Sequence, residues 1–230
     1  MNKQNKPMSP RRTRKREAKV ASILDAALLI ATEEGLERLT THRLAAKLDL
    51  VVGALYRYFP SKEALIAALE VRAIADYREA LTTAWRRTAE ENTDPLAAIV
   101  SLAHAYQELS AKQPAHFHLI NQIMGNPRNL LTDEAASKVL GVMHALFEDL
   151  AIPFEKAVEA ELLNPGCAVE RVTLFWASGM AIVQVGKLGN HDPQLNGDRL
   201  MQSLLMTMLR GWGASDASIK RALNWVYATP

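Results

Sequence analysis

Hydroxyl, phenol and cationic side chains gather between residues 40 and 62 of this 230-residue chain. They begin with Thr40, Thr41 and Arg43 and end with Tyr56, Arg57, Tyr58 and Lys62. No nucleophile, acid and base can be grouped among them as in a hydrolytic site. They are hydrogen-bond donors and positive charges, and this is the chemistry that binds the phosphates of nucleic acid.

The charge of the chain is divided in the same way. Residues 1–62 hold 13 Lys and Arg against 6 Asp and Glu, a net charge of +7, whereas the rest carries −5 and the whole chain +2. A basic front on an acidic body is expected when the front meets a polyanion. The alternative is a solvated basic tail, because seven of the 13 positive residues precede Glu17.

Other classes of protein find little support. With 49% hydrophobic residues the chain can bury a sizeable core. Because Cys167 is the only cysteine, we expect no disulfide within the chain. His116 and His118 are two residues apart on a predicted helix and point in different directions, so we expect no metal site. The sequence has no Gly-rich phosphate loop, no G-x-S-x-G elbow and no H-E-x-x-H pair. We expect neither an enzyme nor a cofactor.

Membrane and secretion signals are also missing. The longest uncharged stretch, 172–186, would rise only about 22 Å as a helix, which is too short to cross a bilayer. The basic amino terminus lacks the apolar core of a secretory signal. A cytoplasmic location is therefore expected.

Apolar residues recur with helical spacing from Val20 onward, and no alternating β-branched run suggests a sheet. The predicted fold is all-α. Gly35 and Pro60 should end helices, and Thr40, Ser61, Asp94 and Ser215 should cap the starts of others. The predicted helices cover about 18–34, 41–48, 52–58, 61–88, 95–112, 115–124, 133–150, 154–163, 168–187, 198–212 and 216–227.

The two short helices at 41–48 and 52–58 are joined by a tight turn and follow a longer helix, which is the arrangement of a helix-turn-helix DNA reader. The run LTTHRLAAKLDLVVGALYRYFPSKEAL, residues 39–65, resembles the DNA-binding motif of the tetracycline-repressor (TetR) family, and the resemblance extends over residues 18–66. The remaining two-thirds is similar to that family only in length and helical character. Residues 1–16 hold no acidic residue and almost nothing to bury, so we expect a disordered basic arm there. The resemblance implies a helix-turn-helix domain at 17–62 and a larger helical domain for effector binding and dimerisation at 63–230.

The resemblance also implies roles for single residues. Thr40, Thr41, Tyr56, Tyr58 and Lys62 occupy positions that contact backbone phosphates, with Arg43 and Arg57 as further partners. The positions that face base edges hold His42, Val52, Gly53 and Ala54, of which the apolar pair could pack on thymine methyls and Gly53 allows close approach. The alternatives are that the tyrosines close the seam to the next helix and that Thr40 is only a helix cap.

Two residues depart from the family pattern. Asp49 stands where a glycine usually adopts a left-handed conformation, which Asp tolerates at a cost of about 1 kcal/mol. Val51 stands where Ser or Thr commonly caps the recognition helix. That helix therefore lacks a side-chain cap.

The body has two candidate functions. The segment 168–187 is apolar on nearly all sides, and 198–212 carries a second apolar stripe. We expect these two helices to pack against the same two helices of a second copy, which gives a four-helix interface in a two-fold homodimer. The alternative is that both helices are core of one protomer. A small-molecule effector site is expected among apolar and neutral polar side chains, each of which could instead fill the core. They are Tyr106, His116, Phe117, Asn121, Met124, His144, Phe147, Trp176, Met180 and Gln184. Such a site favours a neutral or weakly polar, partly aromatic molecule.

Together these patterns predict a DNA-binding transcriptional regulator, a ligand-responsive repressor that binds a palindromic operator as a dimer. One rival is a helical ligand-binding or partner-binding protein whose basic front docks on an acidic protein surface. A helical enzyme is a weaker rival.

Overall fold

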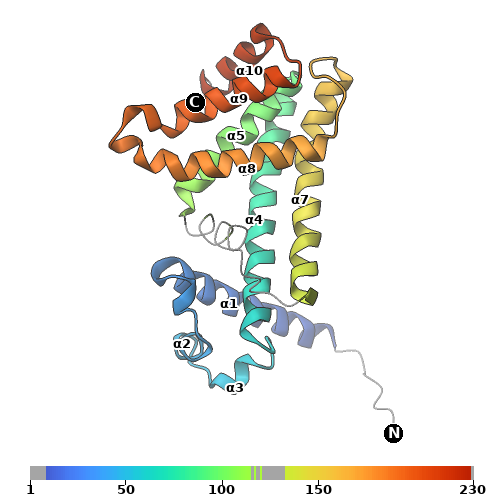
Figure 1. Ribbon diagram of the computed structural model, residues 1–230. Coiled ribbons are helices and arrows are strands. Elements are labelled where there is room, and N and C mark those ends of the chain that lie inside the picture. Colours follow the sequence, from blue (N-terminus) through green and yellow to red (C-terminus); the bar gives the residue numbers. More distant parts are fainter. Residues whose placement is uncertain (1–8, 115–116, 118–119, 121–132, 229–230) are drawn as a thin grey trace.

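The computed structural model describes residues 9–114, 117, 120 and 133–228, and these form a helical protein without a strand (Figure 1). A small amino-terminal domain consists of α1 (Pro10–Glu34), α2 (Thr41–Lys47) and α3 (Val52–Leu55). The 30-residue helix α4 (Lys62–Glu91) starts in this domain and continues into the body (Figure 1). The two parts of the protein are therefore joined by one unbroken helix.

The body is built around α4. Alongside it lie α5 (Pro95–Lys112) and α7 (Asp133–Glu159), while α8 (Ala168–Gly186) runs across them and packs against α5, α7 and α9 (Gly197–Gly211) (Figure 1). The last helix, α10 (Asp216–Ala228), packs on α5 and α9. Short 3-10 helices, η1 (Leu36–Arg38), η2 (Lys187–Asn190) and η3 (Pro193–Leu195), lie in the connections.

The predicted caps are confirmed by hydrogen bonds. The backbone N–H of Arg43 donates to Thr40 Oγ1 at 3.2 Å, and that of Ala64 donates to Ser61 Oγ at 3.2 Å. Asp94 accepts from the N–H of Leu96 at 3.0 Å. Each cap satisfies one donor that the first turn of a helix cannot pair internally.

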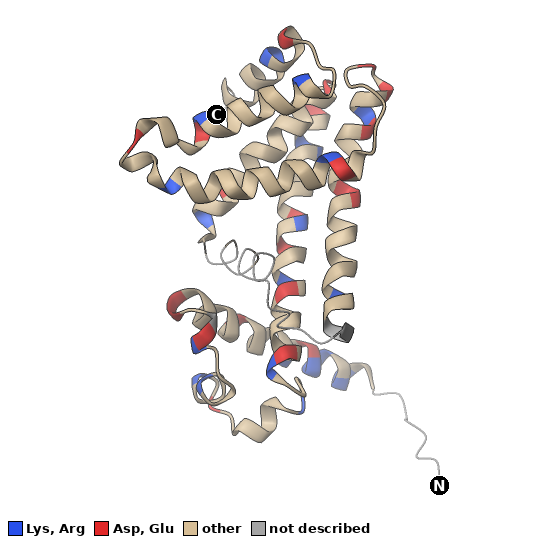
Figure 2. Cartoon of the chain, viewed as in Figure 1, with Lys and Arg blue, Asp and Glu red and all other residues tan. Residues whose placement is uncertain are grey.

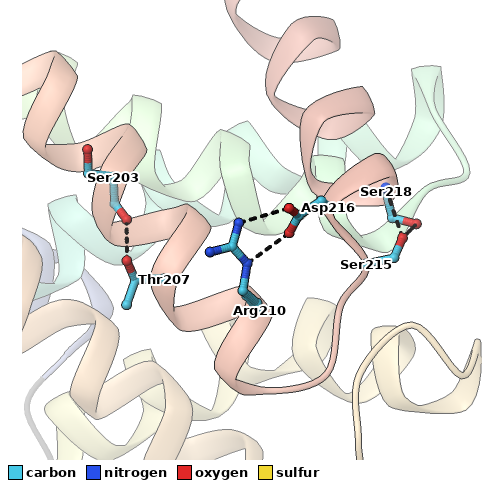
Figure 3. Close-up of polar contacts among 6 residues, drawn as sticks. All are labelled: Ser203, Thr207, Arg210, Ser215, Asp216 and Ser218. Carbon is cyan, nitrogen blue, oxygen red and sulfur yellow. Dashed lines mark hydrogen bonds and ion pairs between the residues drawn. The ribbon is translucent and has the colours of Figure 1, made fainter.

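The junction between α9 and α10 has its own polar contacts (Figure 3). Ser215 Oγ accepts from the N–H of Ser218 at 3.1 Å and caps α10 as predicted. The guanidinium of Arg210 grips both oxygens of Asp216, at 2.8 and 2.9 Å, and this ion pair lowers the pKa of that carboxyl below its usual range. The ion pair thus links the end of α9 to the start of α10.

Three helix boundaries differ from the prediction. Helix α1 begins at Pro10, so residues 10–16 are helical where a disordered arm was expected; Pro is well suited to a first helical position. Helix α3 ends at Leu55 and not near 58. Helix α7 runs unbroken through Pro153, where two helices were expected. The predicted helix at 115–124 falls almost wholly outside the described residues.

Packing explains why Pro153 does not break α7. A proline inside a helix removes a hydrogen bond and costs about 3 kcal/mol or more. On either side of it, Leu150, Ala151, Phe154 and Ala157 are buried, with Phe154 wholly inaccessible. Burying a large apolar side chain contributes about 1.5–3 kcal/mol, so several such residues offset the cost of the proline.

Candidate nucleic-acid interface

The turn between α2 and α3 fixes the angle of the second short helix. Asp49 adopts φ of 51°, the left-handed conformation expected from the sequence. The N–H of Leu50 then donates to the carbonyl of Ala45 at 2.9 Å, and Leu44 and Leu55 are buried on either side. The turn is thus closed by backbone bonds and the two helices share one core.

The outer surface of these helices is exposed and mostly apolar at its tip. Val51, which provides no side-chain cap, is 75% exposed. A Cβ added at Gly53 would meet no atom within 4 Å, so the backbone there is open to an approaching ligand. Thr40, His42 and Arg57 are exposed as well, and Tyr56 is 48% exposed. An apolar tip flanked by donors fits the major groove of a duplex.

Two of the residues predicted to face base edges lie differently. Ala54 is buried with 7% exposure, because on this short helix it shares the inner side with Leu55. Its methyl group therefore cannot reach a base in this conformation. Val52 is half-buried against the core. Val51 instead holds the exposed apolar position. The only feature of the sequence that indicated this role was that Val51 is a hydrophobic residue at the start of a predicted helix.

The residues predicted to bind phosphates differ in how exposed and how free of protein partners they are. Tyr58 packs partly against the core, as the alternative interpretation of the tyrosines expected, whereas Tyr56 points to solvent. Arg43 is paired with Glu34 of α1 and would have to share its guanidinium with a phosphate. Thr41 and Lys62 are half-buried, and Lys62 is the first residue of α4. Thr40 is a cap, which leaves its hydroxyl lone pairs partly engaged.

In the body, aromatic rings surround a small apolar cavity of about 20 Å³. Tyr106 lies between Tyr77 and Phe117, with ring centroids at 6.3 and 5.4 Å, and Trp176 lies 5.6 Å from Phe147. Burial raises the pKa of both Tyr77 and Tyr106 above the ordinary range, so both phenols are neutral. The cavity wall consists of Leu81, Leu102, Tyr106, Leu150, Phe154, Val172, Phe175, Trp176 and Gly179.

Only part of the predicted effector set is brought together. Tyr106, Phe117, Phe147 and Trp176 lie in or beside this aromatic cluster. His144 points away, with a side chain that is 70% exposed and 3.1 Å from Glu148, because it lies on the outer side of α7. Gln184 is exposed on α8 and Met180 is half-buried. The predicted residues His116, Asn121 and Met124 lie outside the described residues.

Glu70 of α4 was not identified from the sequence. It is only 1% exposed, and neither carboxylate oxygen has a hydrogen-bond partner. Burial raises the pKa of this carboxyl to about 7, because a charge is poorly solvated in an apolar core. An acid buried at such a cost often serves function. Its position after Ala67, Ala68 and Leu69 carries no special motif, so no sequence signal could have found it.

Helix α8 has apolar residues on two opposite sides, and only one of these sides is covered by the rest of the body. Ala168, Val172, Phe175 and Gly179 are buried against the body. On the other side a stripe at helical spacing is exposed, and Leu174 and Val185 in it are 46% and 40% exposed. The members of this stripe are Leu174, Ala177, Ala181, Val185 and Leu188.

The same segment has the length and composition of a membrane span. Residues 168–190 reach a mean hydropathy of 1.2, and 17% of the most apolar window is buried. Since one side of α8 packs on α5, α7 and α9, the exposed stripe is a single strip along a helix of the body and does not encircle it. The alternative that α8 is simply core of the protomer therefore does not account for its outer side.

A comparison with known sequences supports the motif. Residues 23–69 match the family described as bacterial regulatory proteins, tetR family. The nucleoid occlusion factor SlmA of Glaesserella parasuis serovar 5 is 27% identical over 161 residues, which are 70% of this chain and 73% of that protein. The HTH-type transcriptional repressor KstR of Mycolicibacterium smegmatis is 48% identical over 46 residues, 20% of this chain and 22% of that protein.

Solved structures share the fold over most of the chain. AibR, in a crystal structure with isovaleryl coenzyme A and operator DNA, aligns with a TM-score of 0.60 at 16% identity, covering 82% of this chain and 97% of that one. At this identity the likeness shows the fold alone. It extends the match from the amino-terminal domain to the helical body.

Proposed function

Because this chain is a DNA-binding transcriptional regulator of the tetR family, we propose that it represses transcription by binding a palindromic operator as a homodimer and leaves the operator when a small molecule occupies the body. The observation that carries the proposal is the exposed face of α2 and α3, with an apolar tip between flanking donors. Members of this family are DNA-binding proteins and not, as a rule, enzymes. We place the protein in the cytoplasm, where the DNA is.

In the proposed complex α3 enters the major groove. Val51, Gly53 and His42 face base edges, and Val51 packs on thymine methyls in the role first assigned to Ala54. Thr40, Thr41, Tyr56, Arg57 and Lys62 hold phosphates on both sides of the groove, and these contacts set affinity and register. Tyr58 and Arg43 take part to a lesser degree, because each already has a protein partner.

We assign dimerisation to the outer stripe of α8 together with α9. An apolar stripe of this length on a soluble protein needs a cover, and a two-fold axis lets the same stripe cover its copy. The small residues Ala177 and Ala181 allow the two α8 helices to approach closely. A palindromic site read by two copies supports the same arrangement, since its half-sites are related by a two-fold axis.

The effector site is proposed at the aromatic cluster around Tyr106 and Trp176. About 20 Å³ is room for roughly one water molecule, so an effector has to push the surrounding helices apart. AibR holds isovaleryl coenzyme A in its crystal structure, which supports an organic ligand for this fold. Native mass spectrometry of the purified protein tests for a retained small molecule.

The variant Lys62→Ala tests the phosphate contacts. We expect it to weaken binding to every duplex by about fivefold at 0.1 M salt and to reduce the slope of log K against log [salt] by about 0.9, because one counterion fewer is released. Fluorescence anisotropy on duplexes selected from a random pool by the wild-type protein measures both values. Lys112→Ala on α5 is the control and should leave the slope unchanged. An unchanged slope for Lys62→Ala would remove this residue from the interface.

Gly53→Ala separates folding from recognition. The new methyl group meets no atom of the protein, so we expect the free energy of unfolding to rise by up to about 1 kcal/mol. In the complex it would stand between the backbone and the bases, so operator binding should weaken by about tenfold. A thermal melt and an operator titration on the same sample compare the two effects. Unchanged operator binding would show that α3 does not approach bases at this point.

A second candidate function comes from the relatives that cover most of the chain, which are named as nucleoid occlusion factors. In that case DNA binding would serve a purpose other than transcription. Mapping bound sites across the genome, with transcript levels in a deletion strain, distinguishes the two. A few bound promoters with changed transcripts support repression, whereas many dispersed sites without transcript changes support the second candidate.

A further inference from the structure

A second basic feature lies at the amino-terminal end of α1 (Figure 2), close to the segment that follows α3. Arg12, Lys15 and Arg16 of α1 and Arg57 and Tyr58 after α3 line one concavity of about 550 Å³. The Arg16 guanidinium lies 5.9 Å from the centroid of the Tyr58 ring, which ties the start of α1 to the segment that follows α3. We call this concavity the basic groove.

The helical register of α1 turns these side chains toward the rest of the amino-terminal domain. Residues 11 apart on an α-helix lie within about 20° of each other. Arg12, Lys15 and Arg16 are 11 residues ahead of Ile23, Ala26 and Ala27, all of which are buried in the amino-terminal domain. The basic stripe therefore continues the stripe that packs on that domain. Arg11 and Arg14 do not line the groove, and Arg14 lies on the opposite side of the helix.

The charge balance of the groove favours an anion. Within the described part of the chain, no carboxylate forms an ion pair with Arg12, Lys15, Arg16 or Arg57. Elsewhere in the described part of the chain, half of the arginines form an ion pair, as Arg78 does with Asp149 and Arg210 with Asp216. Four cations without an ion-pair partner among the described residues repel each other in one concavity and favour an anion. The groove also reaches the segment that follows α3, because Arg57 lies two residues beyond the end of that helix.

We propose that the basic groove binds phosphates of the operator duplex, next to the base pairs that α3 reads, and thereby adds a set of sequence-independent contacts to each half-site. This inference rests on the proposed function and extends it to the amino-terminal end of α1, which lies outside the helix-turn-helix. It assigns α1 two roles: its carboxyl-terminal half supports the core of the domain, and its amino-terminal half holds the DNA backbone.

The test compares two double variants of equal charge. Arg12→Gln/Arg16→Gln removes two groove residues, whereas Arg11→Gln/Arg14→Gln removes two arginines from the same helix outside the groove. We expect the groove variant to bind operator at least about tenfold more weakly at 0.1 M salt and to lower the salt slope by about 1.8, because two phosphate contacts are lost. The control variant should lower the slope by much less. The probes are duplexes that the wild-type protein selects from a random pool.

Phosphate ethylation interference gives a second readout. Wild-type protein and control variant should both show blocked phosphates that disappear only in the groove variant, and circular dichroism should show equal helix content in all three. Equal losses of affinity and slope in the two double variants, or an unchanged interference pattern in the groove variant, would overturn the inference. Wild-type protein that selects no duplex would contradict the proposed function itself.

Discussion

Replacing Leu174 and Ala181 with glutamate is expected to give a folded monomer that binds a palindromic operator about a hundredfold more weakly than the wild type. The two residues lie on the outer stripe of α8, and Leu174 is 46% exposed in the protomer. Glutamate side chains at these positions are therefore solvated in the monomer. In a two-fold dimer they would be buried as four like charges near the axis, which costs far more than the interface gains.

The loss of operator affinity follows from the loss of bivalence. When two DNA-binding domains are joined in a dimer, the second binds its half-site at a high effective concentration. Separating the two domains lowers the overall affinity by a factor of about 10²–10⁴. Binding to a single half-site should remain as in the wild type. Sedimentation velocity and anisotropy titrations on full and half operators measure mass and affinity together.

The control for this experiment is Leu140→Glu on α7. Leu140 is 67% exposed, so the substitution is similar, but it lies off the α8 stripe. We expect this variant to remain a dimer with normal operator binding. A dimeric Leu174→Glu/Ala181→Glu protein would rule out α8 as the interface.

Glu70→Leu is expected to stabilise the protein by about 3 kcal/mol above pH 7 and to have a much smaller effect at pH 4.5. The pKa of Glu70 is raised from 4.5 to about 7 in the folded protein, because the carboxyl is buried without a partner. Between these two values the unfolded chain has released its proton while the folded chain still holds it. Stability therefore falls as pH rises through this window, by about 1.4 kcal/mol per unit.

Urea unfolding of the wild type and the variant at pH 4.5, 6, 7 and 8 measures this linkage. One fixed protein concentration is needed, since a dimer is stabilised by mass action. Glu79→Leu, at an exposed position of the same helix, should change stability by less than about 0.5 kcal/mol at any pH. Parallel pH profiles for wild type and Glu70→Leu would show that the carboxyl has a partner in solution.

Local signals in the sequence predicted much of the fold. The caps Thr40, Ser61 and Asp94 and the terminator Gly35 act within four residues, so the chain itself reveals them. The conformation of Asp49 was predicted for the same reason. The continuation of α7 through Pro153 was not, because burial of Phe154 and its neighbours by other helices decides it.

The candidate site shows the same division. Flanking donors such as Tyr56 and Arg57 follow from the motif, whereas the exchange of roles between Ala54 and Val51 depends on which side of a four-residue helix meets the core. The basic groove and Glu70 could not be predicted. Both depend on the placement of α1 and α4 against other elements, and helical spacing within one segment does not contain that information.

The continuity of α4 has a mechanical consequence. At a rise of 1.5 Å per residue, its 30 residues span about 45 Å, from the amino-terminal domain to the far end of the body. A rod of that length that pivots by about 5° at its far end swings its near end by about 4 Å. The major groove is only about 12 Å wide, so a displacement of this size at Lys62 is enough to spoil the fit. We therefore expect α4 to act as a lever, by which a slight rearrangement around Trp85 at its distant end is magnified at Lys62.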